Sequence, residues 1–123
     1  MKKYLFLFGL VISNTLHANL SDDEKIKMAQ SFSRECTGLS NYAKDVMIAR
    51  QTSKISKEQL LKDASKKPNE FVGSYEIKEV LIKSAFDQPV VSENNNQKNI
   101  VEKFQANTYM TCMQMLINDA NIN

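Results

Sequence analysis

The sequence has little histidine and glycine and no tryptophan. Its one histidine, His17, lies in an N-terminal segment that we expect to be removed, as argued below. Without histidine, the remaining chain cannot form a Ser-His-Asp triad, a Cys-His pair, an HExxH site or a histidine-containing zinc site. Only Gly38 and Gly73 lie beyond residue 18, which excludes a glycine-rich phosphate-binding loop. These absences remove most common catalytic sites.

A long hydrophobic run is also missing. The longest apolar run, Tyr4–Ile12, has nine residues, whereas a membrane-spanning helix needs roughly 20. The run follows Lys2-Lys3 and precedes a polar stretch that ends in Ala18, which is the three-part pattern of a secretory signal peptide. We therefore predict a signal peptide at residues 1–18, cleaved after Ala18, and a single domain at residues 19–123. An uncleaved N-terminal anchor is the alternative. The expected location is the periplasm or the cell exterior.

An excess of charge of one sign is absent once the signal peptide is removed. Removing Lys2 and Lys3 from the 16 basic residues leaves 14, which equals the number of acidic residues. A chain with no net charge lacks the basic surface typical of nucleic-acid and anionic-membrane binding. We therefore expect neither partner after signal cleavage.

Cysteine is scarce but informative. The chain has two cysteines, Cys36 and Cys112, and in an exported protein an even number favours pairing. The alternative is two buried free thiols. Their spacing is far too wide for a CxxC redox motif. A disulfide would leave no thiolate as a zinc ligand or nucleophile, and we expect no metal and no cofactor.

Helical patterns dominate the rest of the sequence, and no strand-like alternation of useful length occurs. Ser21-Asp22-Asp23-Glu24 is a capping box that starts a first helix over about residues 22–51, whose apolar stripe begins at Ile26. Gly38 lies inside this helix and predicts a bend, a break or a close approach by another helix. A second capping box at Ser56 starts a short helix that ends before Pro68.

Two further helices of medium length follow. Gly73-Ser74 starts the first of them, which stops near Pro89; the other begins near Asn95 or Asn96 and is expected to fray from Asn118. The predicted inner stripes of these helices are formed by Ile77, Val80, Leu81, Ser84 and Ala85, and by Ile100, Val101, Phe104, Thr108, Thr111, Cys112, Met115 and Leu116. Both cysteines fall on inner stripes, where their Cα atoms can come within bonding reach of about 7 Å. We predict an all-α, four-helix domain closed by one disulfide.

The residues also resemble a known group. The shared pattern has two halves. The first consists of Cys36, Ala43, Met47 and Arg50-Gln51, and the second of Ile77, Leu81-Ile82, Ala85-Phe86, Pro89, Ile100, Phe104, Tyr109 and Cys112. It is similar to that of a loose group of small, uncharacterised, secreted, all-helical proteins of gammaproteobacteria that carry this cysteine pair. The group's usual turn glycine after Arg-Gln is replaced here by Thr52-Ser53. The resemblance implies a fold and export rather than an activity.

Pairs of carboxylates are the remaining candidates for acid–base catalysis, such as glycoside cleavage. They are Asp22-Asp23-Glu24, Glu58 with Asp63, and Glu76 with Glu79. The competing interpretation is that these acids lie at helix starts or on solvated helix faces. We expect no catalytic residue.

Four residues are candidates for contact with a partner. Arg50 continues the apolar spacing at the end of the first long helix, and its guanidinium suits an anion or a carboxylate of a partner. A contact with the helix dipole or an internal ion pair would also explain it. Tyr109, Met110 and Met113 make the last helix apolar over much of its circumference, as in a Met-rich interaction surface. The alternative is a central helix covered by the others.

Together these features predict an exported, non-enzymatic protein-binding domain. An inhibitor or immunity-type protein is one concrete form, and a homo-oligomer is left open. The alternatives are a small envelope hydrolase that uses only carboxylates, and a structural or chaperone-like envelope component.

Overall fold

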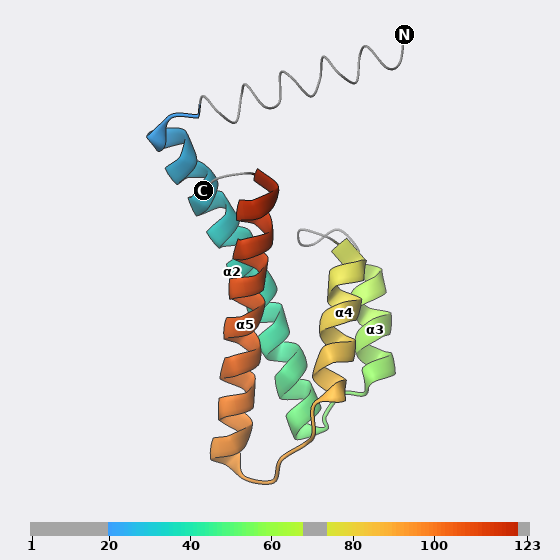
Figure 1. The fold of residues 1–123 in the computed structure, drawn as a ribbon. Coiled ribbons are helices and arrows are strands. Elements are labelled where there is room, and N and C mark those ends of the chain that lie inside the picture. Colours follow the sequence, from blue (N-terminus) through green and yellow to red (C-terminus); the bar gives the residue numbers. More distant parts are fainter. Residues whose placement is uncertain (1–19, 68–73, 121–123) are drawn as a thin grey trace.

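The computed structural model describes residues 20–67 and 74–120. These residues form four helices and no strand: α2 (Asp22–Thr52), α3 (Lys57–Lys66), α4 (Ser74–Asp87) and α5 (Asn94–Ala120) (Figure 1). The prediction of an all-α, four-helix fold is therefore confirmed. The predicted signal peptide at residues 1–18 lies outside the described residues, as do Pro68 and Gly73. None of the four described helices has a stretch long and apolar enough to cross a bilayer.

The two long helices, α2 and α5, run antiparallel and pack against each other. Cys36 near the middle of α2 is bonded to Cys112 in the second half of α5, whereas Gln97 at the start of α5 donates a hydrogen bond to the carbonyl oxygen of Gln51 near the end of α2 (3.4 Å). The shorter helices α3 and α4 form a hairpin that packs beside α2 (Figure 1). The fold is thus a long helix pair with a shorter hairpin against one side.

Side-chain caps set the starts of α2 and α3, where the predicted capping box is complete at Ser21 and only half-formed at Ser56. The Ser21 hydroxyl accepts a hydrogen bond from the Glu24 backbone N–H, and the Glu24 carboxylate accepts one from the Ser21 backbone N–H, both at 3.2 Å. This capping box satisfies two N–H groups that have no partner within the helix. The Ser56 hydroxyl caps α3 by accepting from the Gln59 N–H (3.1 Å).

Helix α2 continues through Gly38 without a break, which excludes one of the three predicted alternatives. The end of α5 differs from the prediction. Helix α5 continues to Ala120 instead of fraying from Asn118, and at 27 residues it is a second long helix rather than a medium one. Leu116 and Ala120 are half-buried, and the packing of these side chains stabilises the last turns of α5.

The buried side chains form two clusters. One lies between the C-terminal half of α2, the α3–α4 hairpin and the start of α5, and consists of Val46, Met47, Ala64, Ile82, Ala85 and Val101. The other lies between the middle of α2 and the second half of α5, around Cys36, Leu39 and Cys112. The buried residues of the hairpin thus belong to the first cluster, while Ile77 and Leu81 of α4 also pack against the second cluster around the disulfide.

The predicted disulfide is confirmed. Cys36 and Cys112 have Cα atoms 5.6 Å apart and a sulfur–sulfur bond of 2.06 Å, and no free cysteine remains. The crosslink joins residues 76 positions apart, so it removes many conformations from the unfolded chain. A crosslink of this kind contributes about 2–4 kcal/mol to stability.

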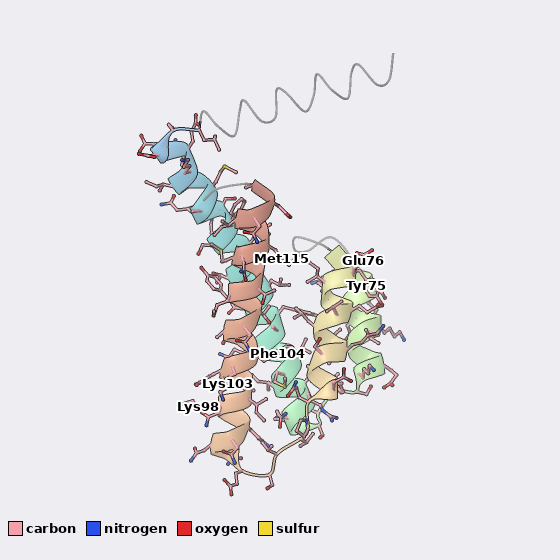
Figure 2. The ribbon with its side chains drawn as sticks, in the orientation of Figure 1. Tyr75, Glu76, Lys98, Lys103, Phe104 and Met115 are labelled. Carbon is pink, nitrogen blue, oxygen red and sulfur yellow. A yellow bond between two sulfur atoms is a disulfide. The ribbon has the colours of Figure 1, made fainter. Side chains whose placement is uncertain are left out.

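Four residues assigned to inner stripes prove to be exposed: Ile26, Val80, Thr111 and Met115. Ile26 is 55% exposed, because it lies in the N-terminal turns of α2, which extend beyond the packed part of the helix pair (Figure 1). Val80 on α4 and Met115 on α5 are 60% and 54% exposed. The assignment of these four side chains to the core was wrong. For Val80, Thr111 and Met115 the reason is a groove between α4 and α5, which all three line; Met115 lies on the side of α5 that faces α4 (Figure 2).

Candidate functional site

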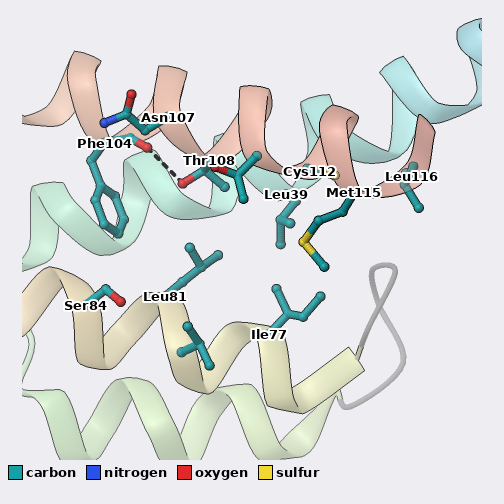
Figure 3. A pocket seen from close by; sticks show the side chains of 12 residues that line it. Leu39, Ile77, Leu81, Ser84, Phe104, Asn107, Thr108, Cys112, Met115 and Leu116 are labelled. Carbon is teal, nitrogen blue, oxygen red and sulfur yellow. Dashed lines mark hydrogen bonds between the residues drawn. The ribbon is translucent and has the colours of Figure 1, made fainter. Parts of the chain in front are cut away.

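An apolar groove of about 480 Å³ opens between α4 and α5, with α2 behind it (Figure 3). Its described lining comes from three helices: Leu39 of α2; Ile77, Val80, Leu81 and Ser84 of α4; and Phe104, Asn107, Thr108, Thr111, Cys112, Met115 and Leu116 of α5. Phe104 and Met115 point from α5 toward α4, and Ile77 and Leu81 point back from α4 (Figure 3). The volume lies within the range of about 300–1,000 Å³ typical of ligand sites.

The groove exists because the helices pack unequally. Helix α2 packs against both α5 and α4, and α4 packs against α3, whereas α4 and α5 approach each other far less closely. The buried apolar residues of the hairpin, Ala64, Ile82 and Ala85, belong to a cluster with residues of α2 and with Val101 near the start of α5. Val80 of α4 lies outside this cluster and is still exposed.

The lining is polar at one end only. Ser84 and Asn107 lie near Phe104, and the Thr108 hydroxyl there donates a hydrogen bond to the Phe104 carbonyl oxygen (2.8 Å) (Figure 3). The other end, near Ile77 and Met115, is apolar. None of the described lining residues is ionisable. The groove therefore offers hydrophobic contact and a few neutral hydrogen-bonding groups, but no acid, base or charged nucleophile.

Gln51 fixes the chain between the two groove helices. Its side chain is 3% exposed and its amide nitrogen donates to the Pro89 carbonyl oxygen (2.9 Å), while its amide oxygen accepts from the Val91 N–H (3.1 Å). Gln97 adds a hydrogen bond to the Val91 carbonyl oxygen (2.6 Å). These contacts hold the end of α4 and the start of α5 against the end of α2.

Arg50 strengthens the same junction. Its Nε donates to the Gln88 carbonyl oxygen (3.1 Å), and its guanidinium lies 5.2 Å from the centre of the Phe86 ring. Arg50 therefore makes internal contacts. Its partners are the Gln88 carbonyl and the Phe86 ring, whereas an internal ion pair was one of the predicted alternatives.

Lys78 holds the hairpin together on the other side of α4. It is 1% exposed, its ammonium donates to the Lys67 carbonyl oxygen at the end of α3 (2.8 Å), and it lies 5.4 Å from the centre of the Tyr42 ring. This contact joins α4 to both α3 and α2. A lysine at this position gave no signal in the sequence, because lysines are mostly exposed.

The structure separates the four predicted partner residues. Tyr109 and Met113 pack against the cluster around the disulfide, and the Tyr109 hydroxyl is hydrogen-bonded to that of Ser33 (2.9 Å). Met110 is 66% exposed and Arg50 lies at the far end of α2. They do not form one surface, and their contact with a partner stays a prediction.

The predicted carboxylate pairs lie at helix starts and in local contacts. Asp22, Asp23 and Glu24 occupy the first turn of α2. Asp63 accepts a hydrogen bond from Gln59 (2.9 Å) and lies 3.8 Å from the Lys66 ammonium. Among residues 20–67 and 74–120, no three acidic, cysteine or histidine side chains gather closely enough to hold a metal ion.

Glu79 belongs to a local row of side chains along α4. The Lys83 ammonium, 3.2 Å away, lowers the pKa of the Glu79 carboxyl, and a hydrogen bond with Tyr75 lowers this pKa further. The same hydrogen bond to Glu79 raises the pKa of the Tyr75 hydroxyl. Both shifts have local causes on an exposed helix face, so they indicate pairing rather than a catalytic acid.

Comparison with known proteins adds no assignment. No protein-family model matches the chain, and no curated protein or solved structure shows significant similarity to it. The candidate site therefore rests on the groove itself. The predicted apolar stripes of α4 and α5 include the groove residues Val80 and Met115, but nothing in the sequence indicates that these residues are exposed.

Proposed function

We propose that this protein is an exported, non-enzymatic protein-binding domain, and that the groove between α4 and α5 is its binding site. The observation that carries the proposal is the pair Val80 and Met115, two apolar side chains that line the same groove and are each more than half exposed. An apolar surface gathered in a concave site is typical of a binding site, whereas single exposed apolar residues are normal.

Hydrophobic burial supplies the binding energy in this proposal. Complete burial of a side chain such as valine or methionine contributes about 1.5–3 kcal/mol. Val80 and Met115 still have more than half of that burial to gain. An inhibitor or immunity-type protein would use such a site to engage one specific partner.

The neutral lining supports binding rather than catalysis. Acid–base and nucleophilic mechanisms need a side chain that can exchange a proton or attack a substrate, and such groups are usually found in or beside the substrate cleft. The described groove residues offer hydroxyl, amide and apolar groups without an ionisable neighbour among them.

The proposed location is the periplasm or the cell exterior. Disulfides form and persist mainly in oxidising compartments outside the cytoplasm. The Cys36–Cys112 bond is compatible with such a location, and the N-terminal pattern of residues 1–18 predicts export.

Site-specific photo-crosslinking tests the proposal. A photoreactive residue replaces Met115 in the groove or, as the control, Ala106, which is exposed on the same helix and lies outside the groove. In cells that express the protein, we expect a discrete protein adduct from position 115 and not from position 106. Val80→Lys, across the groove, should abolish the adduct, whereas Val90→Lys, a surface change outside the groove, should leave it intact.

Equal adducts from positions 115 and 106, or an adduct insensitive to Val80→Lys, would show that the groove is not the binding site. Circular dichroism of each variant checks that the helical fold is retained.

A further inference from the structure

We infer that the partner segment bound in the groove is an amphipathic α-helix whose buried face carries no charge. This inference rests on the proposed function and specifies the chemistry of the partner. It follows from three properties of the described groove: its hydrogen-bonding capacity, its exposure to solvent and its charge.

Hydrogen bonding favours a helix over an extended peptide. The groove walls are helices, whose backbone N–H and C=O groups are largely paired within each helix, and the described residues contain no strand whose edge a peptide could join. An extended segment would bury backbone groups against leucine, isoleucine and methionine side chains without partners. A helix satisfies its own backbone groups and can enter an apolar groove at no such cost.

Exposure favours an amphipathic occupant over a lipid chain. Val80 and Met115 are exposed by 60% and 54% on different helices of the groove, and Asn107 and Thr111 on α5 are also exposed. The groove is therefore open along one side. Sites for small apolar ligands bury about 70–90% of the ligand surface. A hydrocarbon chain would leave apolar surface in water here, whereas an amphipathic helix presents its polar face.

Length and charge define the buried face of the partner. The α5 wall from Phe104 to Leu116 is about 18 Å long at 1.5 Å per residue, which is roughly three helical turns. Helices bound in such grooves insert side chains at positions i, i+3 or i+4, and i+7. Since the described lining lacks charge, the inserted side chains are uncharged. Large apolar residues fit the end near Ile77 and Met115, and a small polar residue fits the end near Ser84.

Selection from a displayed library of random 18-residue peptides tests the inference on the purified, disulfide-bonded protein. Peptides that also bind the Val80→Lys variant are removed, so that the remaining binders depend on the groove. We expect the selected peptides to share uncharged apolar residues at helical spacing and to gain helical circular dichroism when bound. Their affinity should fall at least tenfold for Val80→Lys and Met115→Lys, but less than twofold for the controls Val90→Lys and Ala106→Lys, two exposed positions outside the groove.

The other outcomes separate the two proposals. Groove-dependent peptides with alternating apolar residues or internal prolines would overturn the helical partner and leave the binding site standing. Displacement of an apolar fluorescent dye by monopalmitoylglycerol, with no groove-dependent peptide selected, would overturn the helix in favour of a lipid. Loss of the groove dependence in the photo-crosslinking experiment would instead overturn the proposed function.

Discussion

The side chain of Gln51 and the backbone of Pro89 are joined by a hydrogen bond of 2.9 Å at the end of α2. Because Gln51 also accepts from the Val91 N–H, one buried amide binds both sides of the turn that leads from α4 to α5. This polar contact couples the end of the long helix to the position of both groove walls.

Replacement of this amide should destabilise the fold. Gln51→Ala leaves the Pro89 carbonyl and the Val91 N–H without their partner, and we expect a loss of about 1–3 kcal/mol in the free energy of unfolding. Gln30→Ala, the same change at an exposed position of α2, should alter it by less than about 0.5 kcal/mol. Urea unfolding followed by circular dichroism measures both. Equal effects of the two changes would contradict a specific role for Gln51.

The disulfide should contribute strongly to stability. Replacing both cysteines, Cys36→Ala with Cys112→Ala, should lower the free energy of unfolding by about 2–5 kcal/mol, since it frees a loop that spans 76 positions and removes two buried sulfurs. Urea unfolding with and without reductant provides the comparison. Reductant should destabilise the natural protein and leave the double variant unchanged. A double variant as stable as the oxidised protein would refute this expectation.

Local signals account for the parts of the fold that the sequence predicted. The capping boxes at Ser21 and Ser56 and the helical spacing act within one or two turns, so they identify helices without knowledge of the neighbours. The position of Cys36 and Cys112 on two apolar stripes then predicted the pairing of α2 with α5. The helix predictions needed only residues close in the sequence, and the prediction of the helix pair needed only the covalent bond between the two cysteines.

The groove could not be predicted in the same way. Val80 and Met115 satisfy helical spacing, but their exposure depends on how the hairpin packs against the long helices. Ile82 and Ala85 pack in a cluster with residues of α2, α3 and α5 that are distant in the sequence. The burial of Gln51 was equally inaccessible, because its partners belong to a turn 38 or more residues away. Such long-range packing leaves no periodic trace in the sequence.

Ser53 should be replaceable by glycine with a gain in stability. It ends α2 with φ of 56° and ψ of 25°, in the left-handed region where a side chain is unfavourable and glycine is the usual residue. We expect Ser53→Gly to stabilise the protein by about 0.5–1 kcal/mol. Ser31→Gly, at an exposed position inside the helix, should destabilise it by about 0.5 kcal/mol. Thermal unfolding distinguishes the two signs.

The pH dependence of Glu79 provides a test of the row along α4. Folding lowers the pKa of Glu79 through Lys83 and Tyr75, so the contribution of this carboxylate to stability is present above the ordinary glutamate pKa. It is lost as the pH falls through the lowered pKa of the folded state. NMR titration of the side-chain carboxyl should show a pKa below that of a model glutamate. Lys83→Met and Tyr75→Phe should each raise it. No response to Lys83→Met would mean that the ion pair does not form in solution.

Tyr109 should contribute to stability, whether or not it also contacts a partner. Its ring packs against the disulfide cluster and its hydroxyl is hydrogen-bonded to Ser33, so Tyr109→Ala removes both contacts and should cost about 2–4 kcal/mol. Tyr109→Phe removes only the hydroxyl and should cost about 0.5–1.5 kcal/mol. Met110→Ala, at an exposed neighbour, should change the free energy of unfolding by less than about 0.5 kcal/mol.

Urea unfolding of these three variants, combined with the yield of photo-crosslinked adduct from position 115, separates packing from binding. Tyr109→Phe retains the ring, so a loss of adduct in this variant without a change in stability would assign the hydroxyl to the partner rather than to Ser33. A change of less than about 1 kcal/mol for Tyr109→Ala would show that the ring is not held by α2. We expect the largest loss in free energy of unfolding for Tyr109→Ala, a smaller loss for Tyr109→Phe and the smallest for Met110→Ala. The reason is that the three changes remove progressively fewer contacts inside the molecule.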